Sequence, residues 1–399
     1  MPKDTQDEAS APAASPGDQL NTAPDSLERS SAHHDGPGAG AFRPRPDPSR
    51  PVLAVDAMGG DYAPDEIVAG ALAAHREHGI RILLTGPPAR LRQALAGLGA
   101  DPKANELGII PAEDTLAMDE GALASLRRPR SSAAVACQLV RRGDAAAVVS
   151  AGSTGGVVAT ARLRLRSLPG VLRPGLAVVL PTRPGRTVLI DAGATADPKP
   201  EMLVQFGQLG VAYAQTALGV AVPRVGLLTI GTEPGKGNKF TRRAHELLAA
   251  DPPNGALPLT FAGNVEGGHL LAGELDVIVT DGFTGNVALK TLEGSIRFAA
   301  AELRTAVTGT RAARLGTLLQ RRGLRDLGTR LDAESYGGAV LLGLGGTVVI
   351  AHGASTARAI TSACRLAADL ARGEITEKIT QRLSPGRGAV RGGHFLRRP

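Results

Sequence analysis

From residue 52 onward, short runs of Val, Ile and Leu alternate with Ala-, Leu- and Arg-rich stretches of helical length. Many of the short runs are apolar at every position, which is typical of strands covered by helices on both faces. We expect strands at 52–55, 81–86, 107–112, 145–151, 176–182, 187–192, 224–230, 259–263, 276–280 and 347–352. This alternation predicts an α/β fold of three layers around a doubly wound, mostly parallel sheet.

Five of the loops that lead from a predicted strand into a helix-like stretch are rich in glycine and small polar residues. They read DAMGGDYAP, SAGSTGG, DAGATADPKPE, GTEPGKGN and TDGFTGN. Small residues let a ligand approach the backbone, and free N–H groups at a helix start favour negative charge. Because ligands of such sheets bind beyond the carboxyl ends of the strands, the loops predict one composite anion-binding site.

Lysine is rare in this chain and is concentrated at these loops. Only seven of the 45 basic residues are lysines, so arginine is used wherever any cation suffices. Four lysines fall in or just after the glycine-rich loops: Lys199, Lys236, Lys239 and Lys290. A compact ammonium group fits a crowded phosphate pocket, and chance placement is the alternative interpretation.

Several common signatures of other enzyme classes are absent. No G-x-G-x-x-G follows a predicted strand, and neither G-x-S-x-G nor H-E-x-x-H occurs. GTEPGKGN is one residue too short for a Walker A loop and has Gly237 where Ser or Thr would hold magnesium. Cys137 and Cys364 have no partner at redox or metal spacing, so we expect both to be buried, reduced residues.

Composition divides the chain into a folded region and two tails. Residues 1–50 are rich in Pro, Ala, Ser, Gly and Asp and predict a disordered tail, which leaves residues 51–383 as the domain. Residues 384–399 form a basic tail that we expect to be flexible. There is no secretory signal pattern and no apolar run of the roughly 18 residues that a membrane span requires.

The positive charge is unevenly distributed. Residues 304–330 contain seven arginines and one aspartate, with leucines at helical spacing between them. The simple interpretation is a solvated helical hairpin, at about 296–334. The alternative is a surface that binds acidic protein or anionic lipid through Arg311, Arg314, Arg321 and Arg322.

Seven motifs in order give the sequence a family resemblance. They are VDAMGGDYAP, SAGSTGG, KPEMLVQF, GLLTIGTEPGKGN, FAGNVEG, DVIVTDGFTGNVALKTLEG and YGGAVLLGL with AHGAS after it. Together, over about 52–383, they resemble the bacterial acyl-acyl carrier protein:phosphate acyltransferases. The resemblance implies a fold like that of isocitrate dehydrogenase and phosphotransacetylase, with a protruding helical hairpin.

The resemblance also implies an activity and partners. The enzyme would transfer a fatty acyl group from acyl-acyl carrier protein to inorganic phosphate, giving acyl phosphate for phosphatidic acid and phospholipid synthesis, without cofactor or metal. It would be a cytoplasmic homodimer that binds an anionic membrane surface peripherally, with the hairpin in contact with membrane or carrier protein. A membrane acyl phosphate:glycerol-3-phosphate acyltransferase would use the product.

The implied reaction needs positioning more than an activated side chain. Phosphate is itself the nucleophile, and the thiol leaving group has a pKa of about 8.5, so strong acid help is unnecessary. What remains is to hold two anionic partners and to stabilise an oxyanion. We expect Lys199, Lys290, Asn286 and His352 to be catalytic, with His352 relaying a proton or, alternatively, serving only as a packed loop residue.

The remaining candidates bind substrate or phosphate, or brace the loops that do so. Asp56, Asp61 and Asp281 would repel phosphate, so we expect them to tie down loop N–H groups or to orient lysines. The other candidates are small or polar loop residues: Gly59, Gly60, Gly152, Ser153, Thr154, Gly155, Lys236, Asn238, Asn264, Gly282, Thr284 and Gly285.

Three other interpretations stay open. A phosphotransacetylase-like enzyme using acyl-coenzyme A would need the same loops. A nucleic-acid-binding protein is suggested only by the pI of 9.8 and the arginines, and the scarcity of aromatic residues argues against it. The third is a membrane-recruiting scaffold with a vestigial pocket.

Overall fold

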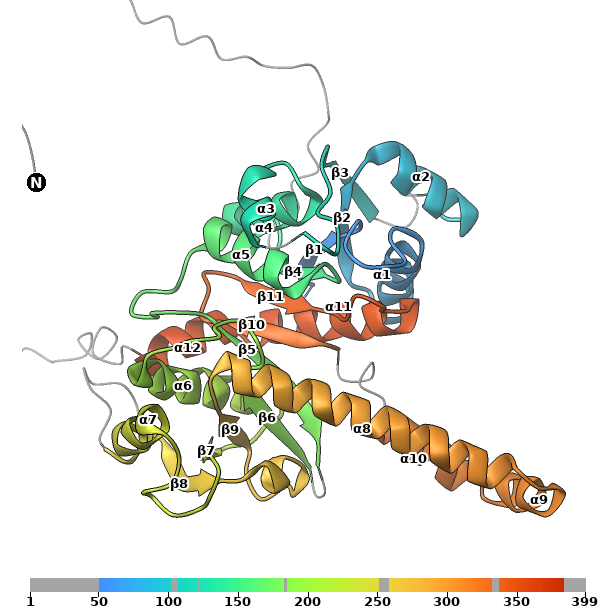
Figure 1. The fold of residues 1–399 in the computed structure, drawn as a ribbon. Coiled ribbons are helices and arrows are strands. Elements are labelled where there is room, and N and C mark those ends of the chain that lie inside the picture. The colour runs from blue at the N-terminus through green and yellow to red at the C-terminus, as the bar shows by residue number, and fades with distance from the viewer. Residues whose placement is uncertain are drawn as a thin grey trace, which may run out of the picture. The chain divides into compact units, whose positions relative to one another are not determined.

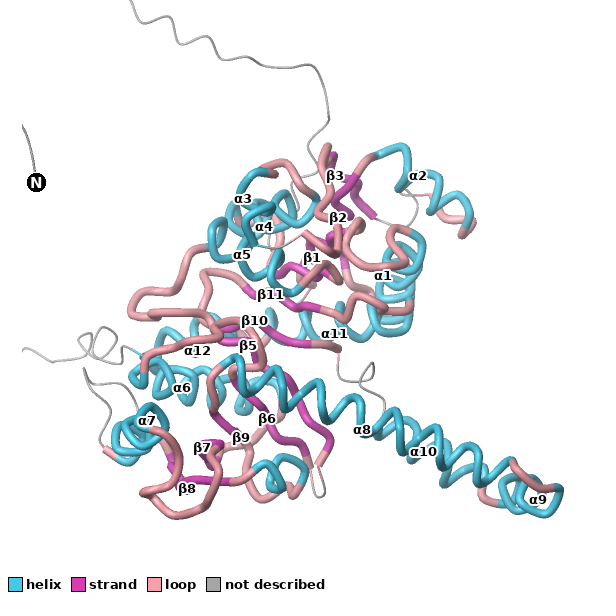
Figure 2. The backbone as a smooth tube through the Cα atoms, viewed as in Figure 1, coloured by secondary structure: helices cyan, strands magenta, loops and turns pink. Residues whose placement is uncertain are grey.

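The computed structural model describes residues 50–101, 107–120, 122–182, 185–250, 258–331 and 337–383. The tail expected at 1–50, apart from Arg50, lies outside the described residues, and so does the tail expected at 384–399. Within the described ranges, an 11-stranded sheet carries helices on both faces (Figures 1 and 2).

The sheet has the strand order β3-β2-β1-β4-β11-β10-β5-β6-β9-β7-β8. In chain order the strands are β1 (Val52–Asp56), β2 (Arg81–Gly86), β3 (Leu107–Pro111), β4 (Ala147–Ser150), β5 (Gly175–Pro181), β6 (Arg186–Ile190), β7 (Arg224–Leu228), β8 (Thr260–Val265), β9 (Val277–Val279), β10 (Ala339–Leu342) and β11 (Thr347–Ile350). Neighbours pair in parallel except at β11–β10, β10–β5 and β5–β6. The predicted mostly parallel α/β sheet is thus confirmed.

Sequence analysis missed one strand, β10. Its four apolar residues stand between Gly337 and Gly338, which have φ of +81° and +93°, and Gly343, at +90°. A run this short between glycines lacks the length by which strands are identified from sequence. The ten predicted strands are all present, and β10 completes the sheet between β11 and β5.

Helices cover both faces because the strands are apolar on both sides. Along β1, Leu53 and Val55 pack into the core of one face, and Val52 and Ala54 into that of the other. The first face is covered by α1 (Asp65–His78), α2 (Pro88–Gly97), α6 (Pro200–Ala217), α7 (Lys239–Ala249), α11 (Ala357–Arg372) and α12 (Ile375–Leu383). The second is covered by α3 (Ala122–Arg127), α4 (Ser132–Arg142), α5 (Thr154–Leu165), a 3₁₀ helix (Gly267–Leu271) and α8 (Gly282–Thr308).

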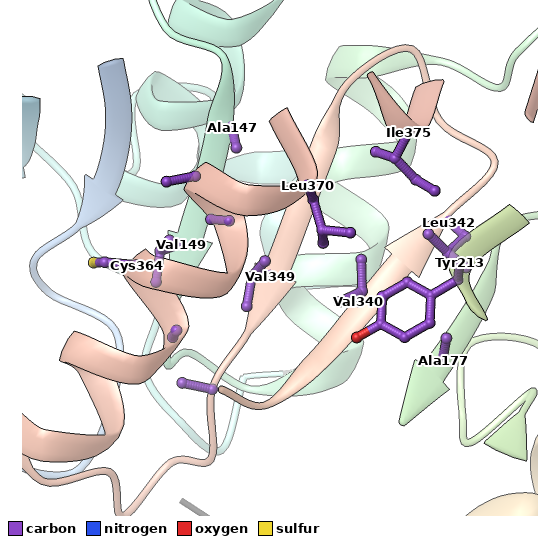
Figure 3. Packing of buried hydrophobic residues seen from close by; sticks show 14 of the residues in the cluster. Ala147, Val149, Ala177, Tyr213, Val340, Leu342, Val349, Cys364, Leu370 and Ile375 are labelled. Carbon is purple, nitrogen blue, oxygen red and sulfur yellow. The ribbon is translucent and has the colours of Figure 1, made fainter. Parts of the chain in front are cut away.

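The core of the first face is shown in Figure 3. Val349 and Val340, from neighbouring strands, lie beside Leu370 of α11 and Tyr213 of α6, whose side chain is 1% exposed. Cys364 belongs to the same cluster, and Cys137 is buried on the other face, as predicted. Burial raises the pKa of both thiols to about 12, because a thiolate would lose its hydration.

The backbone register aligns the carboxyl ends of strands from both halves of the sheet. Residues paired across neighbouring strands form a row that crosses the sheet, with an offset of one residue at β10. The row runs through Asp56, Ser150, Ile350, Ala177, Ile190, Val279 and Leu227. The three antiparallel pairings reverse the strand direction between the halves. Loops after β1, β4 and β11 therefore leave this row in one direction and loops after β6, β9 and β7 in the other.

Up to residue 331, the predicted hairpin region consists of three helices. The 27-residue α8 extends beyond the sheet (Figure 1) and is followed by α9 (Arg311–Leu319) and α10 (Arg321–Leu331). Residues near 296, where we expected the hairpin to begin, lie within α8. None of the helices in the described ranges is both long and apolar enough to cross a bilayer.

Candidate active site

A cavity of about 460 Å³ lies at the centre of the sheet, where the two halves meet. Its floor is β5 with the start of β10, one wall is α8, and the opposite wall is Thr154 with the loop after β11. Four residues expected from the sequence line it: Thr154, Asn286, Lys290 and His352. They come from both halves, so the converging carboxyl ends build a shared site.

Two residues fix the start of α8 beside this cavity. Asp281 is the N-cap, and its side chain accepts a 2.8 Å hydrogen bond from the N–H of Thr284, which satisfies a donor at the open helix end. The N–H of Gly282 donates to the carbonyl of Thr195 at 2.9 Å. Asp281 therefore braces the first turn of α8.

Asp191, at the end of β6, holds the loop that α8 packs against. Its carboxylate accepts hydrogen bonds of 2.6–3.0 Å from the N–H groups of Leu176, Gly193, Ala194 and Thr195. Burial raises its pKa, and these hydrogen bonds oppose the rise. Sequence analysis did not select Asp191, although it follows an apolar strand just as Asp56 does.

Asp56 plays the matching part in the first half of the sheet. The Ser150 hydroxyl donates to its carboxylate at 2.7 Å, and the N–H of Met58 donates at 3.3 Å. Burial raises the pKa of this carboxyl, and the hydrogen bonds counteract the rise. The same Ser150 hydroxyl accepts from the N–H of Gly152 at 3.1 Å, so Asp56 also orders the start of the SAGSTGG loop.

The glycines after β1 allow neighbouring loops to approach. A Cβ on Gly59 would lie 2.7 Å from both the Asp56 carboxylate and the N–H nitrogen of Gly152. Gly60 has φ +112°, and a Cβ there would lie 3.1 Å from the carbonyl oxygen of Gly353. The N–H of Asp61 donates to that carbonyl at 2.8 Å. The β1 loop is thereby tied to the loop that carries His352.

His352 and Ser153 have partners within their own loops. The Nδ1 atom of His352 accepts from the N–H of Ala354 at 3.2 Å, so the neutral ring carries its proton on Nε2. His352 is exposed at the cavity wall. Ser153 is the N-cap of α5: its hydroxyl accepts from the N–H of Gly156 and donates to the carbonyl of Glu120. The exposed Thr154 and Gly155 form the first turn of α5.

The polar side chains of α8 form a stripe along the cavity. Asn286 and Lys290 are one helical turn apart and face the same side. The Lys290 ammonium lies 2.9 Å from a carboxylate oxygen of Glu293, and their side chains are 50% and 23% exposed. Arg297 continues the stripe.

Four other candidates lie away from this cavity, among the described residues. Lys199 is exposed at the start of α6, and Lys236 is exposed in the loop after β7. Asn238 is the N-cap of α7, accepting from the N–H of Thr241 at 2.8 Å. Asn264 lies 2.9 Å from Nδ1 of His245 and donates to the carbonyl of Glu233. The structure thus does not bring all five glycine-rich loops into one cavity.

Comparisons with known proteins agree with this arrangement. A family model described as "Fatty acid synthesis protein" matches residues 52–378. A phosphate acyltransferase of Thermobifida fusca is 63% identical over 335 residues, covering 84% of this chain and 92% of the relative. A phosphate acyltransferase of Thermus thermophilus is 46% identical over 332 residues, covering 83% of this chain and 98% of the relative.

Solved structures of other enzymes share the fold. A phosphotransacetylase from Streptococcus pyogenes superposes with a TM-score of 0.56 at 18% identity, covering 81% of this chain and 94% of that one. A phosphotransacetylase from Staphylococcus aureus gives a TM-score of 0.53 at 16% identity with the same coverage. At these identities the likeness concerns the fold alone.

Proposed function

The chain belongs to the phosphate acyltransferase family, and we propose that it transfers a fatty acyl group from acyl-acyl carrier protein to inorganic phosphate. The acyltransferase activity, with phosphate as acceptor, follows from the family. The carrier-protein donor, the acyl phosphate product and its use in phospholipid synthesis are the proposal. The observation that carries it is the cavity in which Thr154, Asn286, Lys290 and His352 meet beside an apolar floor.

These residues suit the chemistry of the reaction. A phosphate oxygen attacks the thioester carbonyl, the new C–O bond forms, and the C–S bond breaks to release the carrier thiolate. Lys290 and Asn286 offer a cation and a neutral donor from one helix face, suited to phosphate and to the oxyanion. Thr154 offers its hydroxyl and an N–H at the start of α5, and His352 offers its Nε2–H as a hydrogen-bond donor.

Phosphate-dependent thiol release tests the proposal. Purified protein is mixed with long-chain acyl-acyl carrier protein, and free thiol is measured with and without phosphate. We expect release only with phosphate, and a loss of about 100-fold or more in Lys290→Met. Lys378→Met is the matched control, because Lys378 is exposed on α12 and outside the cavity lining. Turnover of acyl-coenzyme A but not of the carrier-protein thioester would favour the phosphotransacetylase-like alternative.

We also propose that the enzyme is a homodimer. Along the outer side of α8, large apolar side chains are exposed: Phe283 is 67%, Val287 50% and Phe298 69% exposed. Apolar residues in this number along one helix are typical of a surface that a partner covers. Sedimentation should give a dimer for the wild type and a shift toward monomer for Val287→Glu; a monomeric wild type would contradict the proposal.

The arginine-rich helices support contact with anionic partners. Leu318 and Leu319, at the end of α9, are 60% and 81% exposed, and the exposed Arg321 and Arg322 follow at once on α10. Exposed leucines next to cations suit the surface of an anionic membrane or of an acidic carrier protein. Arg311 and Arg314 lie on α9 in the same segment. We therefore propose a cytoplasmic enzyme that binds the membrane peripherally.

A further inference from the structure

The cavity under α8 has apolar surfaces on two sides that face each other. On its floor, Leu176, Val178 and Leu180 are alternate residues of β5 and so point to one side of the sheet. On the α8 wall, Leu289, Leu292 and Ile296 follow the spacing of a helix face. These two rows form an apolar groove. Two residues of α8 mark its ends, Asn286 at one end and Arg297 at the other.

The polar stripe of α8 leaves the middle of this groove without net charge. Asn286 is neutral, and the charges of Lys290 and Glu293 offset each other across their 2.9 Å ion pair. The side chain of Glu293 is only 23% exposed, so part of its stem also covers the groove. A groove of this kind suits an uncharged hydrocarbon chain that begins at a polar group near Asn286.

The helical rise gives the length of the groove. Asn286 and Arg297 are eleven residues apart on α8, which corresponds to about 16 Å at 1.5 Å per residue. An extended hydrocarbon with bonds of about 1.5 Å advances roughly 1.3 Å per carbon. The groove therefore accommodates roughly 12 carbons.

We propose that this groove binds the acyl chain of the donor, with the reacting carbonyl at the Asn286 end and the chain running toward Ile296. The inference rests on the proposed acyl transfer and adds where the chain lies and which residue limits its length. Each carbon up to about the twelfth gains contacts in the groove. Carbons beyond it pass Arg297 into solvent and add little to the affinity.

Alkylphosphonates test the groove independently of turnover, since they present an anionic head and a chain of known length. About 0.8 kcal/mol per buried methylene corresponds to roughly fourfold in affinity per carbon. We expect calorimetry to give dodecylphosphonate a Kd roughly 200-fold below that of octylphosphonate, for its four additional methylenes. Ile296→Trp should remove most of this difference and leave the octyl affinity within about twofold.

Two further variants control for indirect effects. Leu303→Trp adds the same side chain one heptad further along α8, outside the cavity lining, and should behave as wild type. Ile296→Asp places a charge at the same partly buried position and should weaken dodecyl binding as Ile296→Trp does.

Three outcomes would overturn the groove assignment: equal affinities of the two phosphonates for the wild type, equal losses in Ile296→Trp for both lengths, or no change for either. Equal losses would place the reacting end at Ile296. Failure of the proposed function is distinguishable, because it would appear as absent phosphate-dependent thiol release while length-dependent phosphonate binding persists.

Discussion

Two glycines, Gly155 and Gly285, each lie in the first turn of a helix. Their substitution by alanine should change the free energy of unfolding in opposite directions. Gly155 lies in the first turn of α5, and a Cβ there would meet no atom within 4 Å. Gly285 lies in the first turn of α8, where a Cβ would collide with the backbone carbonyl of Asp191 and lie 2.9 Å from Cγ2 of Thr280. Alanine is favoured over glycine in helices, and this gain applies to both positions. The two variants should therefore differ because only Gly155 has room for a Cβ atom.

The magnitudes follow from these contacts. Gly155→Ala should raise the free energy of unfolding by up to about 1 kcal/mol, the helix-propensity gain. Gly285→Ala must move a backbone carbonyl that the Asp191 loop fixes, so it should lower the free energy of unfolding by about 3 kcal/mol, the upper end for overpacking. The two variants should thus differ by about 4 kcal/mol.

Urea unfolding followed by far-ultraviolet circular dichroism measures this difference, since the chain contains no tryptophan for fluorescence. Gly282→Ala provides a second test, because its Cβ would lie 2.6 Å from the carbonyl oxygen of Thr195. The reasoning is refuted if Gly285→Ala is as stable as Gly155→Ala. It is also refuted if both variants lose stability equally.

Three further predictions concern charge. Burial raises the pKa of Asp56 above 3.8, so its stabilising contribution is complete below pH 3.8 and is lost as pH rises through the folded-state value. Urea unfolding should show wild type losing stability relative to Asp56→Asn as pH rises from about 4 to 7, and parallel profiles would contradict this. Glu293→Gln should lower the KM for phosphate about two- to fivefold by removing the lysine's partner, whereas Glu246→Gln, in an exposed i,i+3 pair on α7, should not. Replacing Arg321 and Arg322 by glutamate should weaken binding to phosphatidylglycerol vesicles at least tenfold in a flotation assay, and unchanged flotation would exclude these arginines from the contact.

The fold was predictable because its signals are local. In the apolar runs 52–55 and 224–230, residues 52–55 and 225–228 are buried strand positions, so the local run of apolar residues identifies both strands. β10 was missed because four residues between glycines carry too little local signal. Its pairing with Leu176 and Ala177 depends on contacts distant in sequence.

The site was predictable only in part. Lys290, Asn286, Thr154 and His352 stand out as polar residues after strands or at helix starts, and they line one cavity. Whether a loop reaches that cavity depends on strand direction and register, which no local pattern encodes. The loop after β7, which ends at Asn238, has the same composition and yet lies outside the cavity lining, as does Asn264 within β8.

The length of α8 gives it the properties of a lever. Its 27 residues span about 40 Å, from the loop held by Asp191 to the arginine-rich helices. For a rigid rod pivoting at its first turn, a tilt that moves Ile296 by about 1 Å moves Thr308 by about 2 Å. A partner that binds α9 and α10 and so restrains the far end of α8 therefore also restrains the part of α8 that forms the groove wall. A ligand bound at the far end that changes the affinity of the groove for an acyl chain does so by some factor. By linkage, an acyl chain in the groove must change the affinity of the far end for that ligand by the same factor.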